Sequence, residues 1–330
     1  AYRPSMIPNK DLGWEISRTA NFGVDFGLWN NRISGYIEGY ITKTSDLLME
    51  RTLPFFTGFS KVWQNIGKTE NKGIELNIQA NTLKTKSFSW ETTVTFARNW
   101  NKITELLGGG DIRNNSWFIG KPLQVHYNYE MIGVWQLGEE KEAQKYGAIP
   151  GDIKVKDQNN DGSIGELDKV ILGQKDPKII ASLLNSFRFG AFDASINLNM
   201  NFGSLIHPNT YASLITRDGL RWMPSNFKYW TPDNPTNEYT RADKLSGYDP
   251  FAGTGGYMKG DYIKIQDITL GYDFSKIMPK NWKILRARLY AQVRNLGYIY
   301  KACKNDVSPE APDFDYNIPT TYTMGINIDF

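Results

Sequence analysis

The chain has 330 residues, a formal net charge of +3 and a mean hydropathy of −0.47, and 14% of its residues are aromatic. The small charge and the lack of a basic run argue against a nucleic-acid partner. One cysteine, Cys303, and two histidines, His126 and His207, exclude a disulfide framework and a zinc site of the usual spacing. No run approaches about 18 consecutive apolar residues, so transmembrane helices are excluded. A transmembrane barrel remains open, because its strands are only half apolar.

Two-faced strands follow one another along the chain. Period-2 alternation of apolar and polar residues predicts strands at 21–29, 33–41, 74–81, 88–96, 127–135, 193–202, 263–274 and 286–294. In 193–202, Ile196, Leu198 and Met200 alternate with asparagines. The alternation slips by one residue near Asp267, which predicts a β-bulge there. Strands of this length suffice to cross a bilayer at a tilt.

The last eleven residues, 320–330, show the same alternation. The apolar face consists of Tyr322, Met324, Ile326, Ile328 and Phe330. A strand with lipid on one side and a polar lumen on the other has this pattern. An edge strand of a soluble sandwich has it too, so this strand alone leaves both interpretations open.

The connections between the strands have very unequal lengths. Asn30-Asn31 and Gly190 mark tight turns, whereas the segments near 137–177 and 204–261 are long. Soluble domains seldom carry structureless loops of that length, while outer-membrane barrels pair short periplasmic turns with long extracellular loops. The pattern therefore favours an all-β, antiparallel transmembrane β-barrel over a soluble β domain.

The direction of the strands gives a count. We assume that the terminal strand runs toward the periplasm. All long loops then lie on the extracellular side only when a further strand crosses the membrane within 111–119, and the count becomes about eleven strands. A complete bacterial single-chain barrel has an even number of strands. We therefore expect residues 1–330 to be part of a larger barrel.

Several motifs, taken together and in order, resemble the SusC/RagA family of TonB-dependent outer-membrane transporters. They are NKDLGWE (9–15), NFGVDFGLWNNRISGYIEGY (21–40), NIGKTENKGIEL (65–76), FSWETTVTFARNWNKI (88–103), PGDIKVKDQNNDGSIGELDKVILG (150–173), YWTPDNPTNEY (229–239), DYIKIQDITLGYDF (261–274), RNL (294–296) and the terminal GINIDF. The resemblance covers essentially the whole chain.

This resemblance implies the C-terminal part of a 22-stranded barrel in the outer membrane of a Gram-negative bacterium, about eleven strands being half of it. The family's plug domain and TonB box have no counterpart in 1–330. The implied function is TonB-driven import of bulky nutrients, oligosaccharides or peptides. The implied partners are a capping SusD-like lipoprotein, TonB acting through the N-terminal part, the remaining barrel and plug, and the barrel-assembly machinery, which reads the terminal strand.

One segment has the spacing of a calcium loop. Asp157, Asn159 and Asp161 stand at positions 1, 3 and 5 of an EF-hand-like loop, with Gly162 at the sharp turn and the Ser163 carbonyl at position 7. Position 12 is Asp168, where calcium loops prefer Glu. We expect a structural Ca²⁺ held by Asp157, Asn159, Asp161, Ser163 and Asp168. The alternative is a metal-free loop of Asx turns.

The segment 204–259 is rich in aromatic residues. The candidates for a surface that contacts ligand or a capping lipoprotein are Trp222, Tyr229, Trp230 and Tyr239. The alternative is a large loop that folds on itself around its own aromatic side chains. The resemblance favours the contact surface for the segment as a whole.

Two functions from different classes stay open on the sequence. One is the transporter half-barrel. The other is a soluble, calcium-stabilised, β-rich carbohydrate-binding module. No nucleophile and base are arranged as in an active site, so the chain is not expected to be an enzyme.

Overall fold

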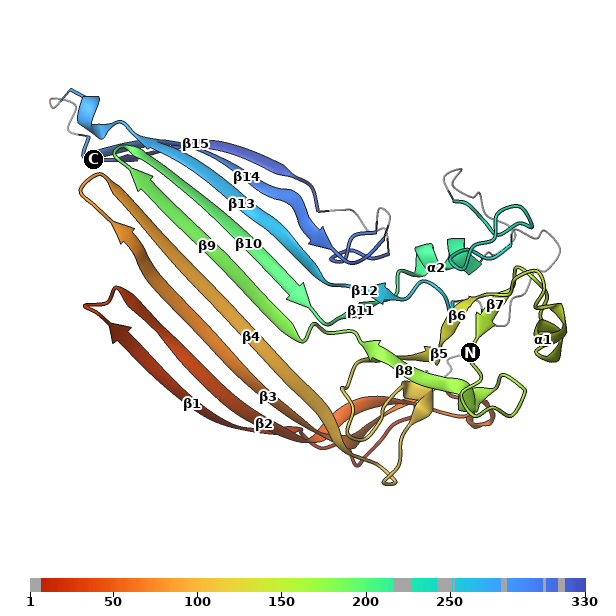
Figure 1. The fold of residues 1–330 in the computed structure, drawn as a ribbon. Coiled ribbons are helices and arrows are strands. Elements are labelled where there is room, and N and C mark those ends of the chain that lie inside the picture. Colours follow the sequence, from red (N-terminus) through yellow and green to blue (C-terminus); the bar gives the residue numbers. More distant parts are fainter. Residues whose placement is uncertain are drawn as a thin grey trace, which may run out of the picture.

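A computed structural model describes residues 7–216, 227–241, 251, 253–279, 284–304, 307–313 and 318–330. Within these ranges the chain forms one nine-stranded antiparallel sheet in the order β1-β2-β3-β4-β9-β10-β13-β14-β15. The sheet is a curved, open wall with β1 and β15 at its edges, and the loop segments gather at one end of it (Figure 1). The strands of the sheet are β1 (Ile16–Leu28), β2 (Ile33–Thr52), β3 (Lys61–Lys84), β4 (Phe88–Leu106), β9 (Ile179–Phe189), β10 (Phe192–Phe202), β13 (Tyr262–Asp273), β14 (Arg286–Lys301) and β15 (Thr321–Asp329).

Short turns join the strands at the end of the sheet opposite the loops. Asn30 and Asn31 adopt positive φ angles of 57° and 59°, which asparagine tolerates, and they reverse the chain between β1 and β2. Gly190, with φ of 60°, does the same between β9 and β10. Both turns stand where the sequence predicts them. The sheet is therefore a meander at its turn end, with the long excursions confined to the other end.

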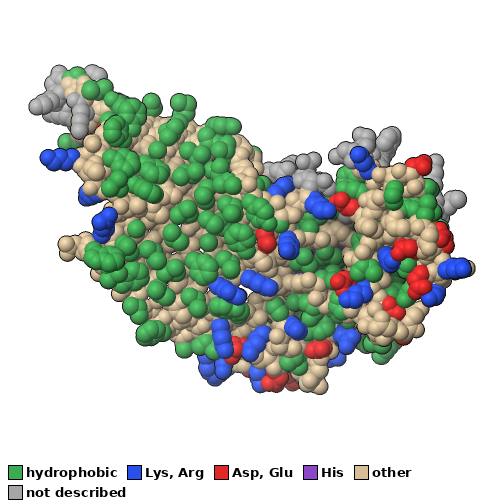
Figure 2. Space-filling model, viewed as in Figure 1, with side chains coloured by type: hydrophobic (Ala, Val, Ile, Leu, Met, Phe, Trp, Pro, Cys, Tyr) green, Lys and Arg blue, Asp and Glu red, His purple; other side chains and the backbone are tan. Residues whose placement is uncertain are grey.

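The strands have one apolar and one polar face, as the alternation predicts. Neighbouring strands match these faces: Leu198 of β10 lies opposite Leu183 and Ile265, and Asn199 lies opposite Ser182 and Lys264. The apolar face is open to its surroundings and is covered with hydrophobic side chains (Figure 2). Its most exposed members include Phe22, Val24, Ile37, Ile74, Leu270, Leu289, Tyr322, Met324 and Ile326.

An apolar face this large is far beyond the patch sizes that soluble monomers expose, so lipid is the environment that suits it. The shortest strand of the sheet, β15, has 9 residues and the longest, β3, has 24. About 9–11 residues cross a bilayer at a tilt, so the longer strands extend past the membrane at the loop end. Among the described residues, no helix has the length and apolar character needed to cross a bilayer.

The predicted bulge at Asp267 is present. The pairing between β10 and β13 shifts between Asn197 and Leu198, because Asp267 pairs with Asn197 and Ile265 pairs with Leu198. The extra residue, Gln266, keeps the apolar residues on one face on both sides of the bulge.

The predicted strand count is wrong for the described residues, which contribute nine strands to the sheet and not eleven. The expected strand within 111–119 is replaced by a short 3₁₀ turn, η2 (Arg113–Asn115), and isolated bridges. The expected strand 127–135 is split into β5 (Val125–Tyr129) and β6 (Met131–Val134), which pair with loop strands instead of with the sheet. In 127–135 the local alternation does mark extended chain, but alternation does not specify which strand such a segment pairs with.

The loop end contains small elements built on one another. β5 pairs with β8 (Lys169–Gln174), β6 with β7 (Ile153–Val155), and β11 (Leu205–Ile206) with β12 (Met258–Lys259). The remaining elements are α1 (Glu140–Lys145), α2 (Asn209–Thr216), η1 (Phe55–Thr57), η3 (Glu166–Asp168) and η4 (Ser275–Ile277). The described parts of the first two long excursions therefore form small strand pairs and short helices at the loop end of the sheet.

Candidate lumen and loop surface

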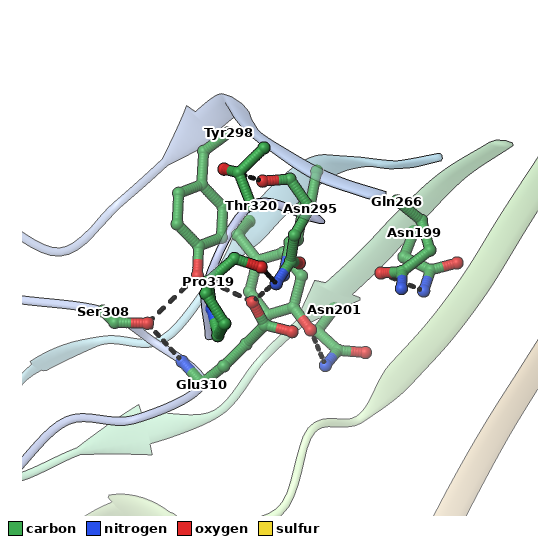
Figure 3. Close-up of polar contacts among 11 residues, drawn as sticks. Asn199, Asn201, Gln266, Asn295, Tyr298, Ser308, Glu310, Pro319 and Thr320 are labelled. Atoms are coloured by element: carbon green, nitrogen blue, oxygen red, sulfur yellow. Dashed lines mark hydrogen bonds and ion pairs between the residues drawn. The ribbon is translucent and has the colours of Figure 1, made fainter. Parts of the chain in front are cut away.

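The polar face of β10 and β13 carries a ladder of amide and phenol contacts near the loop end. The Asn199 amide donates to Gln266 Oε1 at 3.2 Å, and the Asn201 amide donates to the Tyr262 hydroxyl at 2.8 Å. Figure 3 shows Asn199 and Gln266 facing each other from the two strands. The polar face of the wall is therefore lined near the loop end by hydrogen-bonding side chains that contact one another across the two strands.

A largely buried ion pair joins this wall to the loop that follows β14. Lys264 Nζ lies 2.6 Å from Glu310 Oε2, and only 4% of the lysine side chain is exposed. The Tyr298 hydroxyl donates to the same carboxylate oxygen at 2.7 Å and lies 3.0 Å from the Ser308 hydroxyl (Figure 3). A charge this deep needs a partner and further hydrogen bonds, and Glu310 receives both. The cluster fixes loop 307–313 against the inner face of the barrel wall.

The three long excursions meet in one loop body at this end. Its core consists of Tyr211 from α2 with Cys303 and Val307 from the segment after β14. Polar contacts complete it: the Asn209 backbone N–H donates to Asp313 Oδ1 at 2.5 Å, and the Gln136 side-chain amide donates to the Thr236 carbonyl at 3.2 Å. Residues a hundred or more positions apart are therefore held together above the lumen face.

The aromatic candidates do not share one environment. Trp230 is buried, and its indole N–H donates to Gln136 Oε1 at 2.8 Å, so this ring stabilises the loop body. Tyr229 and Tyr239 are half-buried and pack with Phe227. Trp222 lies outside the described residues. Trp230 thus behaves as expected for a loop that folds on its own aromatic side chains. Contact with ligand or lipoprotein stays a prediction for Trp222, Tyr229 and Tyr239.

Both histidines of the chain lie in the loop body, beside Tyr257. His126 Nε2 lies 2.9 Å from the Leu205 carbonyl and therefore carries the proton that it donates. The His207 ring packs on Tyr257 at a tilt of 32°, with the ring centres 4.2 Å apart, and His126 meets the same phenol edge-on at 5.1 Å. Burial lowers the pKa of His126 to about 4, with nearby Lys175 and His207 acting in the same direction. The ring is thus neutral at physiological pH.

The predicted calcium loop has the turn geometry expected of it. Asp157 accepts the backbone N–H groups of Asn160 and Gly162, at 2.7 and 2.9 Å. The Asp161 carboxylate accepts hydrogen bonds from the backbone N–H and the hydroxyl of Ser163. The bond from the Ser163 hydroxyl, followed by the bond from the Asn159 amide, lowers the pKa of the Asp161 carboxyl. The side chains at the first three ligand positions are therefore ordered by the loop itself.

The fifth predicted ligand is engaged elsewhere. Asp168 is buried, with 1% of the residue exposed, and its two carboxylate oxygens accept from the Gln158 and Gly165 backbone N–H groups at 2.8 and 2.7 Å. No group of three or more His, Cys, Asp or Glu side chains in the described ranges is gathered as a metal would require. The oxygen-rich donor set suits Ca²⁺, but the geometry in hand is equally that of a closed Asx-turn loop.

Lys264, Tyr298 and Glu310 are the functional-site residues that sequence reasoning missed. Lys264 sits on the polar face of a predicted strand, and that position is the only signal that could have drawn attention to it. Glu310 lies in a loop, and nothing local in the sequence links it to Lys264. Together with the loop body, these residues form a polar lining and a cap.

A wall with a lipid-suited outer face, a hydrogen-bonded inner face and a folded cap at one end defines an outer-membrane type of β-barrel. A sequence profile described as "TonB dependent receptor-like, beta-barrel" matches residues 2–296. The chain belongs to that family. Membership agrees with the predicted location in the outer membrane of a Gram-negative bacterium and with a protein that is not an enzyme, and it overturns the alternative of a soluble carbohydrate-binding module.

Relatives with similar sequences belong to the same family of receptors. The chain is 27% identical over 99% of its length to TonB-dependent receptor P26 of Formosa agariphila, and 28% identical over 98% of its length to TonB-dependent receptor SusC of Bacteroides thetaiotaomicron. It spans only about a third of these relatives, 36% and 32% of their lengths. A structure of the RagAB peptide transporter has the same fold, with a TM-score of 0.80 at 21% identity, and the match covers 98% of this chain and 36% of that one.

Proposed function

We propose that the chain is the C-terminal part of the barrel of a TonB-dependent active transporter, which imports oligosaccharides or peptides together with a SusD-like surface lipoprotein. The observation that supports this most is the loop body: two long excursions and the segment after β14 are packed into one cap over the polar face of the wall. A bulky nutrient needs a wide, wettable passage and a surface at its mouth that can bind it. The cap and the polar lining supply such a pair of surfaces.

The names of similar proteins supply the rest of the proposal. SusC of B. thetaiotaomicron is a TonB-dependent receptor, and the RagAB structure is that of a peptide transporter. TonB would act through the plug and N-terminal segment of the complete protein. The barrel-assembly machinery would insert the barrel by recognising its terminal strand.

The test uses the full-length gene in its native host. Residues 227–240 of the loop body are replaced by a Gly/Ser linker of equal length, which removes the buried Trp230 and its contact with Gln136. We expect normal outer-membrane abundance, loss of the co-purifying lipoprotein and loss of growth on one nutrient class, glycans or peptides. As a control, Lys141→Ser with Glu142→Ser, at exposed positions of α1 in the same loop body, should leave all three unchanged. Unimpaired growth on every polymeric nutrient after the first replacement would contradict the proposal.

We also propose that the 157–168 loop binds a structural Ca²⁺ through Asp157, Asn159, Asp161, the Ser163 carbonyl and Asp168. The support is the ordered Asp157 and Asp161 carboxylates and the hard-oxygen donor set. Occupancy requires Asp168 to exchange one of its backbone hydrogen bonds for the ion. Affinity should be weak, about 10⁻⁴–10⁻³ M, because position 12 lacks the longer Glu.

The calcium proposal is tested by limited proteolysis of the full-length protein with Ca²⁺ or with a chelator. Wild type should be cut within 157–168 only in chelator. Asp157→Ala with Asp161→Ala should be cut in both conditions, whereas Glu166→Gln, on the exposed side of η3, should behave as wild type. If wild type resists the protease equally in Ca²⁺ and in chelator, the calcium proposal is wrong and the segment is a metal-free loop of Asx turns.

A further inference from the structure

The outer face of the sheet changes character where β1 to β4 approach the loop end. In the register of the sheet, Arg18 pairs with Lys43, Lys43 with Glu70, and Glu70 with Lys102, so these four residues form one row across four strands. In the adjoining row Lys72 lies between Ile41 and Trp100. Three cations and one carboxylate occupy the first row, and past Lys72 and Arg98 the face becomes apolar toward the turn end, as in the row Val24–Ile37–Leu76–Phe96.

These charged residues lie on the lipid-suited face and not in the lumen. Lys72 shares its side of β3 with Ile74 and Leu76, because residues of one parity along a strand share a face. The pairings Ile74–Arg98 and Leu76–Phe96 continue this face toward the turn end. In Figure 2 Lys and Arg side chains gather where the hydrophobic wall meets the loop end. The cations therefore border the apolar band at the level of lipid headgroups.

The carboxylate of Glu70 forms ion pairs with three lysine ammonium groups. Glu70 Oε1 lies 3.1 Å from Lys72 Nζ and 3.3 Å from Lys102 Nζ, and its Oε2 lies 3.9 Å from Lys43 Nζ. The Glu70 side chain is 11% exposed, whereas the lysine side chains are 48–69% exposed. The carboxylate thus sits beneath the lysines and gathers them, while the positive ends remain open to a ligand from outside.

Arg98 and Trp100 extend the cluster on β4. The Arg98 guanidinium lies 4.6 Å from the centre of the Trp100 ring, and its buried Nε has no hydrogen-bond partner among the described residues. Trp at this height is typical of the aromatic girdle at a membrane interface. We call Arg18, Lys43, Lys72, Arg98 and Lys102 the cationic belt.

We propose that the cationic belt binds the phosphate groups of a phosphorylated glycolipid, of the lipid A type, in the outer leaflet of the outer membrane. Ammonium and guanidinium groups bind phosphate oxygens through short, charge-assisted hydrogen bonds. The apolar face directly beside the belt accommodates acyl chains at the same time, which a soluble anion or an acidic protein cannot use. Glu70 alone neutralises one of the five positive charges, so the belt retains an excess of positive charge for the lipid.

The experiment measures lipid binding to the full-length detergent-solubilised transporter by native mass spectrometry. The probes are bis-phosphorylated lipid A, the same lipid with both phosphates removed, and inorganic phosphate as competitor. We expect wild type to bind the phosphorylated lipid roughly tenfold or more tightly than the dephosphorylated one, since several Lys and Arg side chains face the phosphates at once. Millimolar inorganic phosphate should not displace the lipid, because it lacks acyl chains.

Three variants make the test specific. Lys43→Gln, Lys72→Gln and Lys102→Gln combined should abolish the preference for the phosphorylated lipid. Lys141→Gln, Lys145→Gln and Lys156→Gln combined, which change the charge equally within the loop body, should preserve it. Glu70→Gln should increase affinity for the phosphorylated lipid, because the competing carboxylate is lost. Equal binding of both lipids by wild type, or equal losses in the two triple variants, would overturn the proposal.

Discussion

Arg288 of β14 and Asp193 of β10 form a two-pronged ion pair that passes over Gly271 of the intervening strand. Arg288 Nε lies 2.8 Å from Asp193 Oδ1, and Nη2 lies 2.5 Å from Oδ2. A Cβ added to Gly271 would stand 2.5–2.6 Å from atoms of both partners. The glycine therefore makes room for a charge pair that ties three strands together on the lumen face near the turn end.

Gly271→Ala should separate this pair and destabilise the barrel. A double-mutant cycle of Arg288→Ala and Asp193→Ala should give a coupling of about 0.5–3 kcal/mol in the wild-type background and a smaller value in the Gly271→Ala background. Urea unfolding of the full-length barrel in lipid vesicles measures each free energy. Gly39→Ala is the control, because its added Cβ would meet only the Gly73 carbonyl at 3.8 Å. Equal coupling in both backgrounds would show that Gly271 is not needed for the pair.

Leu198 and Asn197 test the assignment of the two faces. The side chains are neighbours on β10 but lie on opposite faces, and the Asn197 amide donates to Asp267 Oδ2 at 3.2 Å. Leu198→Arg should cost about 2–4 kcal/mol if it lies near the bilayer midplane, because the charge would enter hydrocarbon. Asn197→Arg should cost far less, since it faces water and Asp267. Unfolding titrations in vesicles that give equal costs at both positions would refute the assignment.

Phe330 is expected to matter for assembly more than for transport. The residue is 82% exposed and continues the apolar stripe of β15, so within the described residues it contributes little to packing. The family resemblance implies that the barrel-assembly machinery reads this terminal aromatic residue. Deleting Phe330 should lower the amount of heat-modifiable, folded protein in the outer membrane, whereas Phe330→Tyr should retain it. Normal abundance with reduced uptake would contradict this expectation.

Local pattern was enough to predict most of the wall. The alternation through Ile196, Leu198 and Met200, the Asn30-Asn31 turn and the bulge at Asp267 all appear in the structure where the sequence indicates them. Each is a consequence of residues within a few positions of one another. Strand faces and tight turns are therefore readable without knowledge of the partner strands.

Long-range pairing was not readable in the same way. The alternation in 127–135 is genuine, but β5 and β6 pair with β8 and β7 in the loop body and not with the main sheet. Lys264 and Glu310 meet because the segment after β14 folds back across the lumen face. Trp230 could be marked as aromatic and loop-borne, but its burial depends on Gln136, which belongs to a different excursion. These features arise from contacts between distant segments that periodicity does not encode.

His126 should make the loop body sensitive to acid. Its neutral ring is packed beside Tyr257, and the Nε2 proton is donated to the Leu205 carbonyl. Burial lowers the pKa of His126 to about 4 in the folded loop, whereas an unfolded loop would have the ordinary value near 6.5. The unfolded loop therefore takes up a proton first. The stabilising contribution of the neutral ring is complete above about pH 6.5 and is lost progressively as the pH falls toward 4.

Limited proteolysis of the full-length protein between pH 7.5 and pH 4.5 checks this sign. Cleavage within 125–129 and 205–216 should rise as the pH falls. His126→Gln places an amide that can still donate to the Leu205 carbonyl but does not titrate, so cleavage in this variant should change less with pH. Lys175→Gln controls for the neighbouring charge. Removing this charge should raise the pKa of His126 in the folded loop, so cleavage should still rise with acid but by a smaller amount. A pH profile of His126→Gln identical to that of wild type would assign the acid sensitivity to another group.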